Sequence, residues 1–334
     1  MKRLALQNRK AWVEDVPTPV AENENVVVKL HATPICGSDK KHFLSEKPIR
    51  YAGHEGTGTV VAVDKSSFLK VGDRVLTNCL SGCGVCEYCR SGNYVYCDHM
   101  LPFDQHVSHF AQYTVLQDFL CLPLPEDISF DMGALAGCAL APSFNTLNKM
   151  NLMPKDLVMV TGCGPVGLGA IVIAKHYNAR VIAVEVSAYR KNLAKALGAD
   201  YVIDGASGTL EQDILDATGG RRPDKVVETS GLGSLQEFGI KMAAKLGHVG
   251  FVGHNTAPIA ITPNDLIFKG LRLYGSWHVG LNDITDKIYD IIRRSPVAEK
   301  LITHTYSLEQ AQQAFDTFMS GDSGKIMFHP WERG

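Results

Sequence analysis

A six-residue segment in the middle of the chain, Gly162-Cys163-Gly164-Pro165-Val166-Gly167, restricts its fold more than any other segment. It matches the pattern G-x-G-x-x-G, follows an apolar run and precedes a helix-like stretch, which is the setting of a dinucleotide-binding turn. In such a turn Gly162 permits the reversal of the chain, Gly164 lets the backbone approach a pyrophosphate, and Gly167 allows the helix to pack on the strand. The segment therefore predicts a helix N-terminus that binds phosphate.

From about residue 140 onward, strand-like and helix-like segments alternate. The expected strands are 157–160, 181–184, 201–203, 225–228, 248–252 and 271–276. This alternation is typical of a doubly wound parallel sheet with helices on both faces. The preceding residues instead contain short β-branched runs, at 26–30, 58–63 and 111–116. The sequence thus predicts an α/β fold, with a Rossmann domain over residues 141–277 and a mainly β domain before it.

The cofactor expected at the glycine-rich turn is NAD. Glu185 ends the second expected strand, 23 residues after Gly162 (185 − 162). A carboxylate there can bind the adenosine ribose hydroxyls and repel a 2′-phosphate. Arg190 works against this choice, because a nearby cation could accept that phosphate. The alternative is a glycine-rich turn in a Rossmann-like fold that binds no dinucleotide.

A second motif, Cys83-x2-Cys86-x2-Cys89-x7-Cys97, places four cysteines at short spacing. Four thiolates can close a tetrahedron around Zn²⁺, and because such a site leaves no open position, we expect it to be structural. One alternative is an iron–sulfur cluster, whose usual spacing Cys97 does not match. The other is a nucleic-acid-binding zinc ribbon, which a segment with a single basic residue does not favour.

Charge and composition exclude several classes of partner. The formal net charge of −2 offers nucleic acid no electrostatic attraction. The first ten residues lack the apolar run of a secretory signal. The apolar stretch 157–174 is interrupted by glycines and a proline, so we expect no membrane span. Nine cysteines, five of them crowded between Cys79 and Cys97, indicate metal binding rather than disulfides, and hence a cytoplasmic protein.

Three further segments, each weak by itself, gain weight from these two motifs: Cys36-Gly37-Ser38-Asp39, Gly53-His54-Glu55-Gly56 and Cys138. With them, the whole chain resembles the zinc-dependent medium-chain dehydrogenases, the family of alcohol, sorbitol and threonine dehydrogenases. The resemblance implies that Cys36, His54 and Cys138 bind a catalytic zinc, so that the chain holds two Zn²⁺ ions besides NAD. Some polyol dehydrogenases of the family carry Glu in place of the third ligand.

The family's architecture follows as an expectation. A GroES-like catalytic domain would comprise residues 1–140 and 278–334, with the four-cysteine lobe at about 79–100. Relatives are dimers or tetramers, so we expect a homodimer or homotetramer.

The resemblance also implies a chemistry. Two thiolates and an imidazole leave one position of a tetrahedral zinc for the substrate, whose hydroxyl becomes a stronger acid there. Its hydride would pass to C4 of the nicotinamide, behind which Val166 would pack. Ser38 would hydrogen-bond the substrate oxygen and start proton export, and Asp39 would orient the histidine ligand. Glu55 would act electrostatically or as a transient ligand.

The chain departs from the family at several positions. Many relatives carry a terminal proton carrier, a histidine, five residues after the first ligand. Here Lys41 holds that place and His42 follows, so either residue or neither could relay protons. Pro142 replaces a common threonine, which leaves local cofactor contacts in doubt. His109 replaces a glycine, and together with His106 it places two unusual imidazoles near the expected cleft. The alternative is that both are ordinary solvated or core histidines.

The substrate is expected to be rich in hydroxyl groups. By resemblance, the cleft is lined from around Ser38, Phe43, Tyr51, residues 106–110 and Trp277-His278. Buried polar groups would penalise an apolar substrate, which favours a secondary alcohol of a polyol, sugar or cyclitol, oxidised to a ketone. The sequence leaves the working direction open. The alternatives are a simple alcohol or L-threonine-type dehydrogenase, and a non-catalytic NAD-binding relative.

Overall fold

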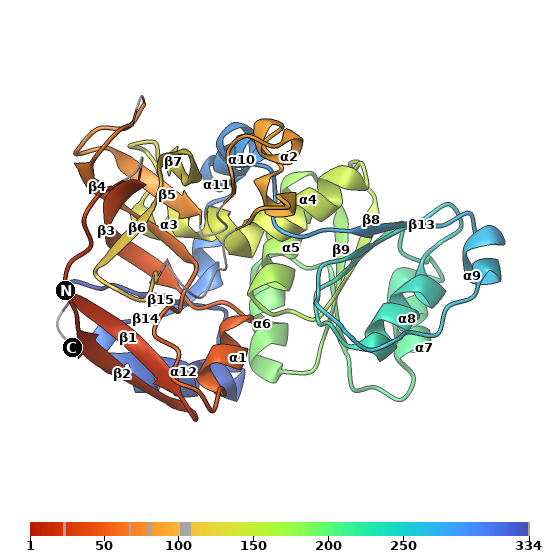
Figure 1. Cartoon of the computed structure of the whole chain (residues 1–334). Coiled ribbons are helices and arrows are strands. Elements are labelled where there is room, and N and C mark those ends of the chain that lie inside the picture. The colour runs from red at the N-terminus through yellow and green to blue at the C-terminus, as the bar shows by residue number, and fades with distance from the viewer. Residues whose placement is uncertain (23–24, 67, 79–81, 101–107, 333–334) are drawn as a thin grey trace. The chain divides into compact units, whose positions relative to one another are not determined.

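The computed structural model divides the chain into two compact units (Figure 1). It describes residues 1–22, 25–66, 68–78, 82–100 and 108–332. The first unit comprises Met1–Cys138, Gly280–Arg293 and Ile302–Gly334, and the second comprises Ala139–Val279 and Arg294–Leu301. The segment Arg294–Leu301 was expected in the first domain. Its 3-10 helix η6 (Pro296–Leu301) packs instead against helices α5 (Pro165–His176) and α6 (Ala188–Ala196) of the second unit.

The first unit is built on a mainly antiparallel sheet around strand β3 (Asn25–Pro34). Among the described residues the strand order is β14-β15-β3-β4-β5-β7, and β6 also pairs with β3. These strands are β4 (Glu55–Val63), β5 (Arg74–Asn78), β6 (Tyr113–Gln117), β7 (Cys121–Pro123), β14 (Ile302–Tyr306) and β15 (Lys325–Phe328). The β-branched runs predicted as strands therefore form strands, because their alternate side chains fill a buried core.

An aromatic core joins the beginning and the end of the first unit. Strands β1 (Lys2–Gln7) and β2 (Lys10–Asp15) form a hairpin whose turn residues have left-handed backbone angles. This hairpin packs against helix α12 (Ala311–Ser320) near the other end of the chain (Figure 1). Phe315 of α12 stacks on Phe43 of helix α1 (Asp39–Phe43), with ring centroids 4.7 Å apart.

Short helices complete the first unit. They are α2 (Glu87–Arg90), the 3-10 helices η1 (Tyr94–Tyr96), η3 (Asp118–Leu120) and η7 (Leu308–Gln310), helix α3 (Phe130–Leu135), and the run α10 (Leu281–Asp283), π-helix η5 (Ile284–Ile288) and α11 (Tyr289–Arg294). Tyr94 and Val95 of η1 are buried in one core cluster with Val26 and Val28 of β3, which anchors the segment after β5 to the sheet.

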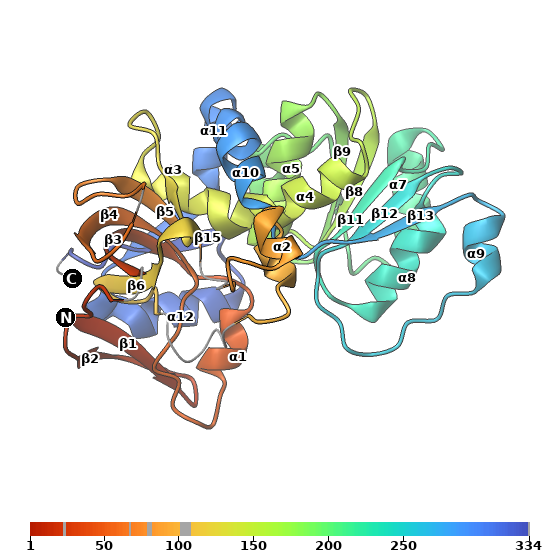
Figure 2. The same cartoon turned by 45° about the horizontal axis from the view of Figure 1, so that its top comes forward.

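The second unit contains a parallel sheet in the order β10-β9-β8-β11-β12-β13, counted over the described residues (Figure 2). The strands are β8 (Leu157–Thr161), β9 (Arg180–Glu185), β10 (Tyr201–Asp204), β11 (Lys225–Glu228), β12 (His248–Phe251) and β13 (Arg272–Gly275). The remaining helices are α4 (Ala141–Lys149), α7 (Leu210–Thr218), α8 (Gly233–Met242) and α9 (Pro263–Ile267). The doubly wound sheet predicted from the sequence is confirmed. Its order reverses beside β8, at whose carboxyl end such sheets bind ligands.

The apolar run 157–174 is divided between strand β8 and helix α5. Within the part of the chain that the structure describes, no helix has both the length and the apolarity needed to cross a bilayer.

The glycine-rich turn connects β8 to α5, and its glycines have different steric surroundings. Gly162 has a φ of 84°, in the left-handed region. A Cβ on Gly167 would lie 1.9 Å from the carbonyl oxygen of Gly162 and 2.7 Å from Oγ1 of Thr229. A Cβ on Gly164 would meet no atom of the described residues within 4 Å.

Gly167→Ala is therefore expected to lower the free energy of unfolding by about 3 kcal/mol, because the added methyl forces the helix away from the turn. Urea denaturation of the cofactor-free protein measures this loss. Gly164→Ala is the matched control and should change stability little. An equal loss of unfolding free energy in both variants would show that the close approach of Gly162 to Gly167 does not cause the loss.

Candidate functional site

Four potential metal donors gather inside the first unit. Cys36, His54, Glu55 and Cys138 are all buried, and their donor atoms all lie within 4.8 Å of one another. The sulfurs of Cys36 and Cys138 are 3.5 Å apart. Two thiolates on one tetrahedral zinc lie about 3.8 Å apart, given Zn–S bonds of about 2.3 Å. The structure thus brings together the three residues predicted as ligands of a catalytic zinc.

Local structure explains how distant residues meet here. Cys36 follows the end of β3, and His54 directly precedes β4, which pairs antiparallel with β3. Gly53, with a φ of 78°, lets the chain pass close to Phe110, because a Cβ there would lie 2.6 Å from that ring. Cys138 lies in a π-helical turn, Ala136–Leu140, between α3 and α4. Such turns are frequent at functional sites, because the extra residue re-aims a side chain.

The donor set suits zinc. The hydrogen bond between the two sulfurs, together with the nearby imidazole of His54, lowers the pKa of Cys36 well below its usual value, although burial opposes this. The same hydrogen bond and burial raise the pKa of Cys138. The cluster thus places two buried sulfurs next to one imidazole. Soft sulfur and imidazole donors at this spacing favour Zn²⁺ over hard cations.

Lys325 is a member of this site that the sequence analysis missed. It lies on β15, is fully buried, and its Nζ is 2.8 Å from each carboxylate oxygen of Glu55. Burial alone would lower the pKa of Lys325, but the Glu55 carboxylate and the two sulfurs raise it above its usual value. The ammonium therefore stays charged and holds Glu55. A lone lysine in the apolar run of residues 325–328 was the available signal.

The residues expected to assist the zinc lie around His54. Asp39 is fully buried; its Oδ2 accepts the backbone N–H of Cys36 at 2.8 Å, and its Oδ1 lies 3.5 Å from Nδ1 of His54. The exposed Ser38 has its Oγ 3.4 Å from Nε2 of His54. Of the two candidate proton carriers, Lys41 is exposed and His42 is buried.

Several residues expected near the substrate lie in the core. Phe43 and Phe110 are fully packed, and both rings contact Phe315. His109 is also fully buried, and its Nε2 is 2.8 Å from Oγ1 of Thr77. Burial and the nearby His54 lower the pKa of His109 to about 3, so its ring is neutral. It is a core histidine, whereas Tyr51 is more exposed.

Two residues of the expected lining segment, His106 and Val107, lie outside the described residues. Trp277 and His278 belong to the second unit, where Trp277 is partly exposed.

The four-cysteine motif forms a second donor cluster in the first unit. Sulfurs of Cys83, Cys86, Cys89 and Cys97 all lie within 4.8 Å of one another. Backbone N–H groups of Cys83 and His99 each approach the Cys97 sulfur at 3.3 Å. Backbone N–H groups of Val85 and Cys86 lower the pKa of Cys83 to about 6, which favours the thiolate needed by a metal. The four cysteines predicted as ligands of a structural metal therefore lie together in one cluster.

The predicted cofactor residues cluster at the carboxyl edge of the second unit's sheet. Gly164 caps helix α5 and Pro165 begins it, while the carbonyl of Val166 accepts a hydrogen bond from Ser143. Glu185 ends β9 and accepts three backbone N–H groups, from Cys163 at 2.6 Å, Val186 at 2.8 Å and Ser187 at 2.9 Å. The carboxylate is thereby fixed beside the turn. Arg190 lies in the first turn of α6, where its backbone N–H is capped by Ser187.

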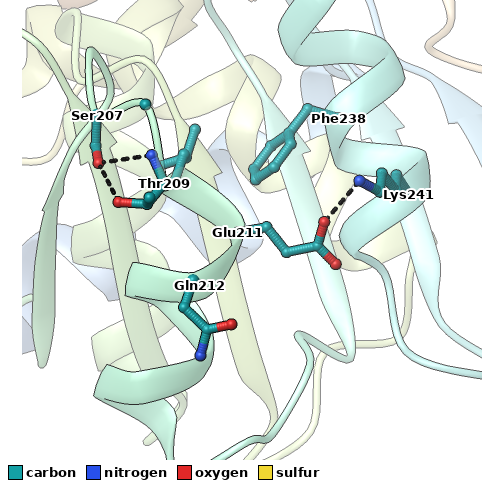
Figure 3. Close-up of a pocket in the computed structure, with 8 residues that line it drawn as sticks. Ser207, Thr209, Glu211, Gln212, Phe238 and Lys241 are labelled. Atoms are coloured by element: carbon teal, nitrogen blue, oxygen red, sulfur yellow. Dashed lines mark hydrogen bonds and ion pairs between the residues drawn. The ribbon is translucent and has the colours of Figure 1, made fainter.

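A separate hollow of about 450 Å³ lies between α7 and α8 of the second unit (Figure 3). Its charged groups are already paired, because Glu211 contacts Lys241 at 2.6 Å and Arg222 at 2.7 Å. Ser207 and Thr209 turn toward each other at its rim (Figure 3). It contains none of the residues predicted to bind metal, cofactor or substrate, so we do not assign the site there.

The family models, the relatives and the solved structure that match this chain are all dehydrogenases. A zinc-binding dehydrogenase model matches residues 165–294, and an alcohol dehydrogenase GroES-like domain model matches residues 22–126. The L-threonine 3-dehydrogenase of Pseudoalteromonas translucida is 30% identical over 331 residues, covering 96% of both chains. That of Chromobacterium violaceum is 30% identical over 339 residues, covering 98% of this chain and 99% of the relative. The solved alcohol dehydrogenase TADH from Thermus sp. ATN1 matches with a TM-score of 0.92 at 25% identity, covering 98% of this chain and 99% of that one.

Lys325→Met is expected to lower the free energy of unfolding by about 3–5 kcal/mol, because it leaves the Glu55 carboxylate buried without an opposite charge. The double variant Glu55→Gln/Lys325→Met removes both charges and should recover most of that loss. Urea denaturation at fixed zinc concentration measures both.

Lys287→Met is the matched control, because its pair with Asp283 is partly exposed at 2.9 Å. It should cost less than about 1 kcal/mol. Equal destabilisation by the single and double variants would contradict a stabilising role of the Glu55–Lys325 pair.

Proposed function

Because the chain belongs to the family of zinc-dependent medium-chain dehydrogenases, we propose that it interconverts a secondary alcohol and a ketone with NAD as hydride carrier. The observation that carries this proposal is the buried cluster of Cys36, His54 and Cys138 beside the exposed hydroxyl of Ser38. Two sulfurs and one imidazole are a catalytic rather than a structural donor set, because they leave one position for substrate.

The residues of the cluster have separate parts in this reaction. A zinc ion held by Cys36, His54 and Cys138 would supply Lewis acidity that makes the substrate hydroxyl easier to deprotonate. Ser38 would accept a hydrogen bond from the substrate hydroxyl at its Oγ and pass its own hydroxyl proton to solvent, to which it is exposed. Oδ1 of Asp39 lies 3.5 Å from Nδ1 of His54 and would receive its N–H, which leaves Nε2 for the metal. Glu55 contributes negative charge that Lys325 neutralises.

We assign a second, structural zinc to Cys83, Cys86, Cys89 and Cys97, which gives two ions per chain. Four thiolates exclude substrate, so this ion would only hold the segment between β5 and β6 in shape.

The glycine-rich turn and Glu185 support NAD as the cofactor. The turn leaves backbone N–H groups at the N-terminus of α5 for a pyrophosphate. Glu185, held beside the turn by three backbone N–H groups, keeps about one lone-pair site that can accept a hydrogen bond from a ribose hydroxyl. NAD, when bound, would supply the acceptor for the hydride.

For the substrate we propose a secondary alcohol of a polyol, sugar or cyclitol. A second candidate is L-threonine, whose side chain is also a secondary alcohol. The names of the two relatives that are 30% identical over nearly the whole chain favour this candidate.

We also propose that the protein is a cytoplasmic homodimer or homotetramer. The cysteines that the structure describes form no disulfides, which fits a reducing compartment. The edge strand β13 has no second neighbour among the described strands, and Leu246, Ile267 and Phe268 are exposed large apolar residues of the same unit. Unpaired edges and exposed apolar residues are features of surfaces at which copies associate.

A substrate screen with metal analysis tests the proposal. The purified protein should contain about two zinc ions per chain and reduce NAD with a polyol, sugar, cyclitol or L-threonine from a panel that includes simple alcohols. Cys138→Ala should keep one zinc, still bind NAD and lose turnover, because the catalytic ion loses a ligand. Unchanged turnover of Cys138→Ala would remove this residue from the catalytic site.

Glu185→Gly is expected to raise the efficiency with NADP relative to NAD by about tenfold or more, a change of about 1.4 kcal/mol, because it removes a charge that repels the 2′-phosphate. Steady-state kinetics with both cofactors measures the ratio. Glu185→Gln removes the charge with less change of structure than Glu185→Gly, because its amide oxygen can still accept the backbone N–H groups of Val186 and Ser187, although its NH2 group then faces the N–H of Cys163. A preference of the unmodified protein for NADP would refute this role of Glu185.

A further inference from the structure

The histidine that stands one place later than in many relatives points into the protein. His42 lies on the short helix α1, three residues after Asp39, and only 8% of it is exposed. Lys41, which holds the usual place, is exposed. A buried ring is badly placed to deliver protons to solvent, so His42 needs another explanation.

Asp39 presents one carboxylate oxygen to two imidazoles. Its Oδ2 accepts the backbone N–H of Cys36, while its Oδ1 lies 3.5 Å from Nδ1 of His54 and 3.7 Å from Nδ1 of His42. Neither this Oδ1 nor Nδ1 of His42 makes a hydrogen bond to a described residue. Buried polar atoms without partners are costly, and a carboxylate oxygen has two lone pairs for two donors. A shift of a few tenths of an ångström would satisfy both atoms.

Charge favours the same arrangement. The carboxylate of Asp39 faces the rings of both His54 and His42, and a carboxylate beside two imidazoles is normally ionised. An ionised carboxylate accepts hydrogen bonds only, so both ring nitrogens that face it must be donors.

We propose that His42 is a positioning residue for the metal site: its Nδ1–H donates to Oδ1 of Asp39 and holds this carboxylate against Nδ1 of His54. The inference rests on the proposed function, because it matters only if His54 ligates zinc through Nε2. Without His42, the carboxylate can rotate about its bond to Cβ, and the ring of His54 loses its fixed tilt toward Cys36 and Cys138. The effect reaches the metal through two hydrogen bonds, with no contact between His42 and the ion.

Three substitutions of His42 separate a directed hydrogen bond from simple packing. His42→Asn places an amide N–H near the position of Nδ1, His42→Gln places it near the position of Nε2, and His42→Leu provides none. Lys40→Leu, an exposed residue of the same helix, is the control for helix changes. Comparing Asn with Gln remains decisive even if the Leu variant folds poorly.

The readouts are the rate at which zinc passes to a chelator and the visible spectrum of the cobalt-substituted protein, neither of which requires turnover. The Leu and Gln variants should release the catalytic ion about tenfold faster, in the range of losses seen for residues that support a ligand. Their cobalt bands should shift, while the Asn and Lys40→Leu variants should match the unmodified protein. Cys138→Ala gives the background release from the four-cysteine site.

Two results would overturn the inference: unmodified zinc release and cobalt bands in the Leu variant, or equal behaviour of the Asn and Gln variants. A different result would contradict the proposed function, and this inference with it: the unmodified protein would release no more zinc to the chelator than Cys138→Ala does. The two failures are therefore distinguishable.

Discussion

The buried ion pair between Lys325 and Glu55 is the interaction on which the first unit's site depends. Two cysteines and a glutamate share one buried space, where mutual repulsion and lost hydration would disfavour their ionised forms. Lys325 supplies the opposite charge from β15, which pairs antiparallel with β3 just before Cys36. The pairing of these two strands is therefore an electrostatic requirement of the site as well as part of the sheet.

The sequence predicted those features that short spacing determines. The glycine pattern 162–167 and the four-cysteine motif each specify a local turn, so the fold class and the family were predictable from a few residues. Lys325 was not, because it lies 270 residues from Glu55 and only the sheet register joins them. The burial of Phe43 and Phe110 was missed for a related reason: Phe315, the ring that covers both, lies on a helix about 200 residues away or more.

The direction in which a side chain points from a short helix is a second feature that the sequence could not predict. A shift of one residue turns a side chain by about 100° on a helix, which decides whether a histidine faces solvent or Asp39. The sequence therefore offered Lys41, His42 or neither residue as the proton carrier, but it could not show which of the two side chains faces solvent. The π-helical turn at Cys138 is equally invisible in the sequence, since its one-residue excess depends on packing at both ends.

The first unit is discontinuous in the chain, and this has a consequence for biosynthesis. The second unit lies mainly in one stretch, Ala139–Val279, whereas strand β15 emerges from the ribosome well after Cys36 and His54. Since domains fold as their residues become available, the later part of the chain can assemble while the earlier part waits for its partner strand. During that interval Cys36 and His54 lack the neighbouring charge of Lys325, so this donor cluster is complete only after β15 has joined the sheet.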